Sequence, residues 1–270
     1  MLLKRCLPKF SALTLVLLVA CAEEPPPPAA ATPEEPPPPP HIAGRAVFSG
    51  AEPAVEALPM RSVDPNCAEL RDGQTNFSAV RLGEANPADE RRGLADVFVF
   101  LKDAPPATDE APEESLVVTA RSCFYDPPVA GLQVGQTLVI ENADPTLHQP
   151  RHSPRGGGEP LAFRFQQPFE GMRSEIRFDR AARRLEIGCA SHPWMRGYLA
   201  VMEHRWFTVT DENGRFELRD PPAGDGDEWI VAAWHPTLGE RELTARLGEQ
   251  DLVLEFSAPG TPPPAGRIPP

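Results

Sequence analysis

Short runs of alternating or continuous apolar residues recur from residue 43 to residue 202, separated by turns rich in Gly, Pro and Asn. Alternation with a period of two is typical of β-strands, because successive side chains of a strand point to opposite faces. A long helical period is not evident in the sequence. The pattern therefore predicts an all-β protein with strands at 43–48, 96–101, 116–120, 137–141, 162–165, 175–178, 185–189 and 198–202.

Two further alternating runs flank the pair Asn213-Gly214. An Asn-Gly pair between alternating runs is the strongest short-range sign of a β-hairpin, because both residues accept the positive φ of a tight turn. We therefore expect a hairpin over residues 207–218, and the apolar run 229–234 predicts the next strand.

The first twenty residues carry Lys4, Arg5 and Lys9 before an apolar run that is too short to span a bilayer, which is typical of a signal peptide. The sequence Leu18-Val-Ala-Cys21 resembles the bacterial lipoprotein signal, in which the mature chain begins at a lipid-modified cysteine. This resemblance implies that Cys21 anchors a periplasm-facing lipoprotein in the bacterial cell envelope. An ordinary secretory signal cleaved nearby is the alternative.

Residues 23–40 consist almost entirely of Pro, Ala and Glu, and residues 259–270 are again rich in Pro. Such segments cannot bury a core. The first is predicted to be a semi-rigid polyproline spacer that reaches about 50 Å at ~3.1 Å per residue. The sequence between the two tails is long enough for one large or two small domains.

The formal net charge is −13, and loss of the three basic residues of the signal segment leaves about −16. A nucleic acid would be repelled by this charge, so nucleic acid binding is excluded. An acidic surface could steer a basic redox partner such as a cytochrome, but acidity also simply keeps proteins soluble.

Four residues carry the chemistry of a copper site. The motif Cys189-Ala-Ser-His192-Pro-Trp-Met195 supplies a thiolate, an imidazole and a thioether, and His148 lies about forty residues upstream. Soft sulfur ligands combined with imidazoles suit copper that cycles between Cu(I) and Cu(II). A trigonal His-His-Cys plane with a weak axial Met is the blue-copper arrangement, so the residue types favour electron transfer.

The segment 134–144, Val-Gly-Gln-Thr-Leu-Val-Ile-Glu-Asn-Ala-Asp, resembles the strand that precedes the first ligand histidine in the small blue copper proteins, the cupredoxins. The loop that begins at Cys189 resembles the ligand loop of amicyanin. The resemblance covers residues 115–203 and implies a Greek-key β-sandwich. The family usually has Asn directly after the first histidine, where this chain has Gln149.

By matching positions, the resemblance implies one mononuclear type I copper site. His152 is an alternative ligand, and a solvated loop histidine is the other interpretation of that residue. Electrons in related proteins pass through the exposed edge of the loop histidine, so Pro193, Trp194 and Tyr198 are the expected docking patch unless they pack against the core. The implied copper ligands are His148, Cys189, His192 and Met195.

Residues 207–224 resemble the hairpin of carboxypeptidase regulatory-like domains, which are transthyretin-like β-sandwiches. Such modules begin with strands like 43–48 and 96–101, which lie upstream of the copper region. We therefore expect a cupredoxin sandwich inserted in or adjacent to a regulatory-like sandwich. The expected divisions are a signal peptide (1–20), a Pro-rich linker (21–40), a first sandwich part (41–103), a cupredoxin domain (104–203), a second sandwich part (204–258) and a Pro-rich tail (259–270).

Residues 41–257 as a whole resemble bacterial envelope proteins often labelled methylamine-utilisation-like, although nothing in the sequence argues for methylamine as a substrate. Of the five cysteines, Cys6 leaves with the signal, Cys21 takes lipid and Cys189 takes copper. Cys67 and Cys123 remain, and an oxidising compartment favours a disulfide between them. If they do not pair, both are buried thiols.

The expected function is that of a membrane-tethered type I copper electron carrier that is not an enzyme. Copper enzymes that reduce oxygen or nitrite need further histidine clusters, and the sequence has no His-x-His pair. A copper-handling protein that delivers or sequesters the metal is one alternative, although the chain has only 5 Met and 6 His. A metal-free β-sandwich scaffold of the envelope is the other.

Overall fold

The computed structural model describes residues 41–85, 91–108, 110–152, 161–222 and 228–258. About half of these residues are in β-strands and very few are in helices, which confirms the all-β fold class. Their helices, α1 (Met60–Val63) and α2 (Pro65–Glu69), are short, and no helix within the described ranges is long and apolar enough to cross a bilayer. The signal segment, Cys21, the Pro-rich linker and the Pro-rich tail lie outside the described residues.

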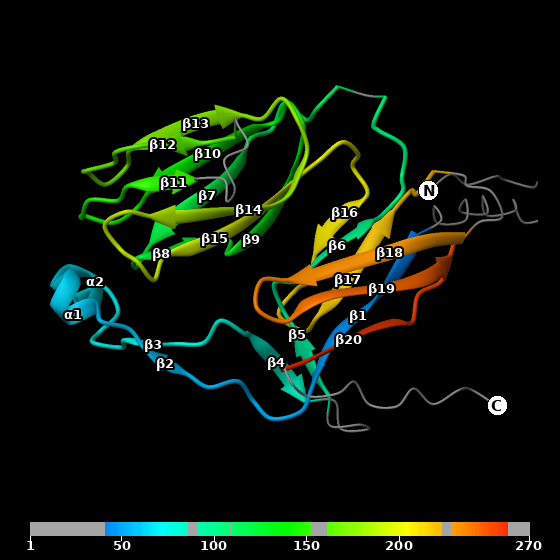
Figure 1. The fold of residues 1–270 in the computed structure, drawn as a ribbon, viewed down its shortest axis with the longest axis horizontal. Coiled ribbons are helices and arrows are strands. Elements are labelled where there is room, and N and C mark those ends of the chain that lie inside the picture. Colours follow the sequence, from blue (N-terminus) through cyan, green and yellow to red (C-terminus); the bar gives the residue numbers. More distant parts are fainter. Residues whose placement is uncertain (1–40, 86–90, 109, 153–160, 223–227, 259–270) are drawn as a thin grey trace, which may run out of the picture. The chain divides into compact units, whose positions relative to one another are not determined.

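Two sheets combine strands from before and after the central part of the chain (Figure 1). In the first, β1 pairs antiparallel with β17 and parallel with β20, and the sheet continues through β5 to β4. The second has the order β16-β6-β18-β19. The chain therefore leaves these sheets after β6 and returns to them at β16. Their strands are β1 (His41–Ser49), β4 (Leu82–Ala85), β5 (Arg92–Leu94), β6 (Phe98–Leu101), β16 (Phe207–Val209), β17 (Arg215–Arg219), β18 (Glu228–His235), β19 (Gly239–Arg246) and β20 (Leu252–Ser257).

The core of these two sheets follows from the alternation of the sequence. In β17, Phe216 and Leu218 are buried while the neighbouring charged residues are exposed. Fully burying an apolar side chain of this size contributes about 1.5–3 kcal/mol, so the inward face fixes the strand's register. The buried cluster includes Ile42, Phe48, Leu94, Val99, Leu101, Phe216, Leu218, Val231, Leu254 and Phe256.

The central part of the chain forms two further sheets, in the orders β13-β10-β7-β8 and β12-β11-β14-β15-β9. Parallel pairs join β10 to β7 and β15 to β9, and the remaining pairs are antiparallel. Their inner faces bury a second core of apolar side chains. The strands are β7 (Leu116–Arg121), β8 (Phe124–Asp126), β9 (Val129–Gln133), β10 (Thr137–Asn142), β11 (Pro150–His152), β12 (Phe163–Arg164), β13 (Arg173–Arg177), β14 (Ala182–Cys189) and β15 (Arg196–Met202).

Each of the eight strands predicted from the apolar pattern overlaps an observed strand. The prediction of a hairpin at Asn213-Gly214 was wrong, because the strands on either side of the turn do not pair with each other. The tight turn is present, with Gly214 at φ +76°. However, β16 pairs with β6 in one sheet while β17 pairs with β1 in the other. The turn packs against β1, because Ala46 N donates to Gly214 O at 2.7 Å. The chain crosses here between two sheets rather than folding back within one.

Residues 56–77 pack against the second core, although the first strand of the central sheets, β7, begins only at Leu116. This segment contains the helices and the strand pair β2 (Glu56–Ala57) and β3 (Asn76–Phe77). Met60, Cys67 and Ala68 are buried in the cluster of the central sheets. Cys67 is bonded to Cys123 in a disulfide, so a covalent link holds the helices to the β7–β8 turn.

We predict that replacing Cys67 and Cys123 together by Ala lowers the free energy of unfolding by about 4 kcal/mol. The sequence separation of the two cysteines is 56, and a crosslink restricts the unfolded chain more as the loop becomes longer. Urea denaturation of the metal-free protein measures the effect, and reduction of the unmutated protein should reproduce it. A double variant as stable as the unreduced parent would contradict the prediction.

Candidate metal centre

Three buried donor atoms converge at one end of the central sheets. His148 lies in the loop between β10 and β11, Cys189 is the last residue of β14, and His192 lies in the loop before β15. Cys189 Sγ is 3.9 Å from His148 Nδ1 and 3.7 Å from His192 Nδ1. The two Nδ1 atoms are 3.1 Å apart. The structure thus brings together three of the four residues predicted as ligands through donor atoms that face one another.

The outer nitrogen of each imidazole is bonded to a carboxylate. His148 Nε2 is 2.9 Å from Asp144 Oδ2, and His192 Nε2 is 3.0 Å from Asp64 Oδ2. An ionised carboxylate only accepts hydrogen bonds, so each Nε2 carries the proton that it donates. Both Nδ1 atoms therefore face the centre, where each can carry a proton in the metal-free protein or offer its lone pair to a metal, as in metal sites where a carboxylate orients the histidine.

This arrangement is electrostatically unfavourable unless a cation joins it. Two nitrogen lone pairs and a sulfur atom face one another in a buried space, and only a proton or a metal ion removes their repulsion. In a trigonal site with metal bonds of ~2.0 Å to nitrogen and ~2.3 Å to sulfur, donors lie roughly 3.5 Å (N to N) and 3.7 Å (N to S) apart. The observed separations of 3.1, 3.7 and 3.9 Å fit such an ion.

Cys189 is held ready as a thiolate. Its side chain is buried, which by itself disfavours ionisation, but hydrogen bonds from His148, His192 and the Gln149 backbone outweigh burial and lower the pKa of the thiol. Burial likewise opposes charge on His148, but the hydrogen bonds to Asp144 and Cys189 raise the pKa of that imidazole. The metal-free centre therefore favours a proton on the His148 imidazole, and metal binding would release this proton.

The β7–β8 turn fixes Asp144. Ser122 and Cys123 both adopt positive φ, at +49° and +58°, which turns their two successive N–H groups toward the same side. Ser122 N donates to Asp144 Oδ1 at 2.7 Å and Cys123 N donates to Oδ2 at 2.9 Å. Burial by itself would raise the pKa of Asp144. The hydrogen bonds from His148 and from these two N–H groups have the larger effect, so the pKa of the carboxyl is lowered. The turn thus provides an anion-binding concavity for the carboxylate.

Asn142 organises the loop that carries His148. Its Nδ2 donates to the carbonyl oxygens of Thr146, Gln167 and Phe169, and its Oδ1 accepts from Asp144 N. The residue is fully buried. One amide therefore satisfies several backbone groups that the irregular loop leaves unpaired.

Gln149, the residue directly after His148, joins two loops of the centre. Its backbone N donates to Cys189 Sγ at 3.3 Å and its carbonyl accepts from Ala190 N at 3.0 Å. Its side-chain oxygen accepts from Ser191 Oγ at 3.0 Å. Gln149 therefore links the loop after His148 to the loop after Cys189.

Met195 is buried in the same apolar cluster as Cys189, at 1% exposure. Its backbone N donates to His192 O at 3.0 Å, which closes a tight turn over residues 192–195. The sequence spacing from Cys189 to Met195 thus folds into a compact loop, and the thioether stays in the interior.

The expected exposed edge of His192 is not present. His192 is 1% exposed, because Asp64 and Cys67 cover its outer nitrogen, and Cys67 Sγ lies 3.5 Å from Nε2. Trp194 is 8% exposed and donates to Cys123 O, so it packs in the core. The prediction of a docking patch centred on an exposed edge of His192 is therefore wrong. Residues 60–69, far away in sequence, close that side.

Other candidate ligands lie apart from these donors. His152 Nδ1 bonds to Glu186 O at 2.7 Å, and Met202 packs in a separate apolar cluster. His204 and His235 are buried, and desolvation lowers the pKa of both imidazoles. Every potential ligand group of three in the described part of the chain contains His148 or His192.

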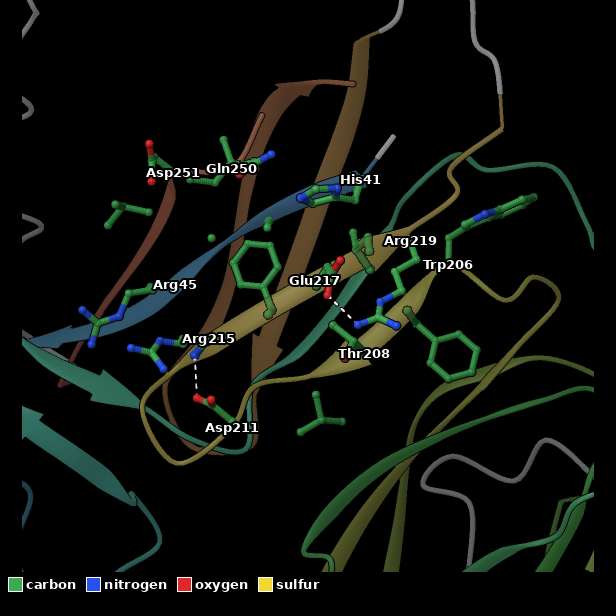
Figure 2. Close-up of a pocket in the computed structure, with 18 of the residues that line it drawn as sticks. His41, Arg45, Trp206, Thr208, Asp211, Arg215, Glu217, Arg219, Gln250 and Asp251 are labelled. Atoms are coloured by element: carbon green, nitrogen blue, oxygen red, sulfur yellow. Dashed lines mark hydrogen bonds and ion pairs between the residues drawn. The ribbon is translucent and has the colours of Figure 1, made fainter. Parts of the chain in front are cut away.

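A large hollow in the described residues lies elsewhere. This pocket of about 1160 Å³ extends along β1, β16 and β17 (Figure 2), and its lining shares no residue with the donor cluster. Arg219 pairs with Glu217 at 2.9 Å, and Arg215 N donates to Asp211 at 2.8 Å.

Comparison with known proteins found no matching protein family and no matching curated protein. Among solved structures, a copper-containing nitrite reductase from Thermus scotoductus SA-01 is 23% identical over 36% of this chain (TM-score 0.30), and the chain spans 25% of that reductase. A purple cupredoxin from Nitrosopumilus maritimus is 22% identical over 33% of this chain and 100% of its own (TM-score 0.29). An oxidised point mutant of amicyanin is 22% identical over 39% of this chain and 98% of its own (TM-score 0.30).

These neighbours are cupredoxin-type proteins, and they cover only about a third of the chain. The assignment of ligands therefore rests on the positions of the side chains themselves. Sequence reasoning missed the two carboxylates. Asp144 stands inside the strand motif that precedes His148, and Asp64 starts the motif Asp64-Pro-Asn-Cys67, in which a helix cap precedes a cysteine.

We predict that Asn142→Ala lowers the free energy of unfolding of the metal-free protein by about 3 kcal/mol. The change leaves three carbonyl groups and one backbone N–H without their side-chain partner in a buried loop. Denaturation with urea measures the loss. Asn76→Ala, at an exposed position of β3, is the matched control and should change stability by less than about 0.5 kcal/mol. Equal effects of the two substitutions would refute the role assigned to Asn142.

Proposed function

We propose that this protein is a type I copper electron-transfer protein, tethered to a membrane of the bacterial cell envelope and facing the periplasm. The observation that carries the proposal is the set of facing Nδ1 atoms and thiolate sulfur, each on a residue at most 4% exposed. A His₂Cys set with an axial thioether is the donor set of blue-copper sites, and Met195 lies in the same apolar cluster as Cys189. His148, Cys189 and His192 would hold the ion, and Met195 is the proposed axial ligand.

When bound, copper would take up and release one electron between Cu(II) and Cu(I). The chain's contribution is to keep the donors in one arrangement for both states. Asp144 and Asp64 hold the two imidazoles by their outer nitrogens, and Gln149 N donates to the sulfur. The three donor residues are at most 4% exposed. A site that hardly moves between oxidation states exchanges electrons quickly.

The burial of the donors favours a carrier over the alternative functions. A copper-delivery protein must pass the ion to another protein, and an enzyme must let a substrate reach it. Either needs access to donors that are here at most 4% exposed. A metal-free scaffold gives no reason for two carboxylates that turn both Nδ1 atoms toward one sulfur. Electron transfer requires only that a partner, such as a cytochrome or another carrier, come near.

The sequence features of residues 1–40 support the location of this carrier. A lipid at Cys21 would hold the chain at the membrane, and the Pro-rich residues 21–40 would keep the copper unit away from the surface. The spacer gives the carrier the reach it needs to meet its redox partners.

We predict that the protein binds one Cu(II) and gains an intense visible band from charge transfer between the thiolate and copper. Cys189→Ser should abolish the band, because only the thiolate provides this transition. Met195→Leu should retain copper but raise the reduction potential, since the axial donor helps to stabilise Cu(II). Optical titration and electrochemistry measure both effects.

Met172→Leu is the matched control for the thioether, because Met172 lies outside the apolar cluster that contains Cys189 and Met195. It should leave the band and the potential unchanged. A band that persists in Cys189→Ser would place the copper elsewhere, and no band in the unmutated protein would favour the metal-free scaffold.

We also predict that the protein fractionates with membranes when it is expressed in a bacterium, and that Cys21→Ala releases it or leaves it unprocessed. The reason is the small residue before Cys21, which matches a lipoprotein signal. Mass spectrometry of the mature N-terminus is the decisive measurement. A mature chain that starts beyond residue 21 without lipid would contradict the anchor.

A further inference from the structure

The outer edge of His192 is the most unusual feature of the centre. Its Nε2 lies 3.0 Å from Asp64 Oδ2 and 3.5 Å from Cys67 Sγ. Both residues belong to the segment with α1 and α2, which precedes the ligand loop by more than a hundred residues. A group from outside the copper-binding strands therefore determines how this histidine is oriented.

Asp64 is held firmly in its position. Thr146 Oγ1 donates to Asp64 Oδ2 at 2.7 Å, and Asn66 N donates to Oδ1 at 3.0 Å. Asp64 is also the N-cap of α2, and Cys67 within that helix is bonded to Cys123. The carboxylate thus has one acceptor oxygen engaged with its own helix and the other directed at the histidine.

The arrangement repeats on the other histidine. Asp144 accepts from His148 Nε2, and the same carboxylate oxygen accepts from Cys123 N. Cys123 and Cys67 are the two ends of the disulfide. One covalent link therefore connects the segments that place a carboxylate behind each imidazole.

We infer that Asp64 is a positioning residue of the copper centre, which fixes the Nε2–H tautomer of His192 and turns Nδ1 toward the metal. This inference rests on the proposed function for its copper part. A carboxylate behind a ligand histidine makes the imidazole a stronger donor, and loss of such a partner typically lowers metal affinity about 10–100-fold. The negative charge also stabilises Cu(II) more than Cu(I).

Three variants separate the charge, the hydrogen bond and the helix cap. Asp64→Asn keeps an acceptor oxygen but removes the charge. Asp64→Ser keeps a good N-cap but is too short to reach His192. Glu69→Gln removes the same charge from the exposed end of α2 and is the matched control.

In the copper-loaded full chain, we expect Asp64→Asn to retain the thiolate band, to raise the reduction potential and to weaken Cu(II) binding about 10–100-fold. Glu69→Gln should match the unmutated protein in all three. If Asp64→Asn and Glu69→Gln gave the same potential and the same affinity, Asp64 would be only a helix cap and the inference would be overturned.

The metal-free full chain gives a readout that does not depend on copper. Nitrogen-detected NMR should show a slowly exchanging Nε2–H proton on His192, retained in Asp64→Asn and lost in Asp64→Ser. An unchanged proton in the Ser variant would overturn the positioning role. If the unmutated protein bound no copper while this proton behaved as expected, the proposed electron-transfer function would fail and the tautomer assignment would stand.

Discussion

The structure depends on one arrangement: two imidazole nitrogens and a sulfur are directed at one another in a buried space, where they repel one another unless a proton or a metal ion joins them. His148, His192 and Cys189 form this arrangement at separations of 3.1 to 3.9 Å. Side chains would normally rotate away from such repulsion. They remain because each imidazole is held from behind by a carboxylate, and each carboxylate is held in turn by backbone N–H groups. The hydrogen bond at each outer nitrogen, Nε2, thus fixes the direction in which the inner nitrogen, Nδ1, points.

Some of these supports come from the loop of the first histidine itself, and others come from segments that are remote in sequence. Asn142 and Gln149 arrange the loop around the first histidine, and the positive-φ turn at Ser122 and Cys123 binds Asp144. The short helices contribute Asp64. The apolar core beneath them, shared by the central sheets and the helical segment, gives these polar groups a rigid base. The polar network therefore depends on the same packing that holds the sheets together.

The strands could be predicted from sequence, because alternation of apolar residues is a local property. The spacing from Cys189 to Met195 is also local and pointed to Cys189 and His192, while the resemblance of residues 134–144 to a cupredoxin strand pointed to His148. The residues that cover His192 could not be predicted in this way. The contact between Asp64 and His192 spans 128 residues, and no local period encodes it. The Asn213-Gly214 turn shows the same limit, because its geometry is local while its strand partners are not. The prediction of an exposed histidine edge failed because it came from the ligand loop alone.

The strand order also determines when each part of the protein can be completed as the chain emerges into the compartment where it folds. A chain emerges with its N-terminus first, and domains generally fold as units as they appear. The central sheets are complete once β15 (Arg196–Met202) has emerged, so the donor cluster can close early. Apart from its short pairing with β5, β1 must wait for β17 and for β20 (Leu252–Ser257), the last strand described. The sheet that contains β1 is thus completed after the central sheets, and residues 44–49 of β1 gain their β20 partners only when residues 252–257 have emerged.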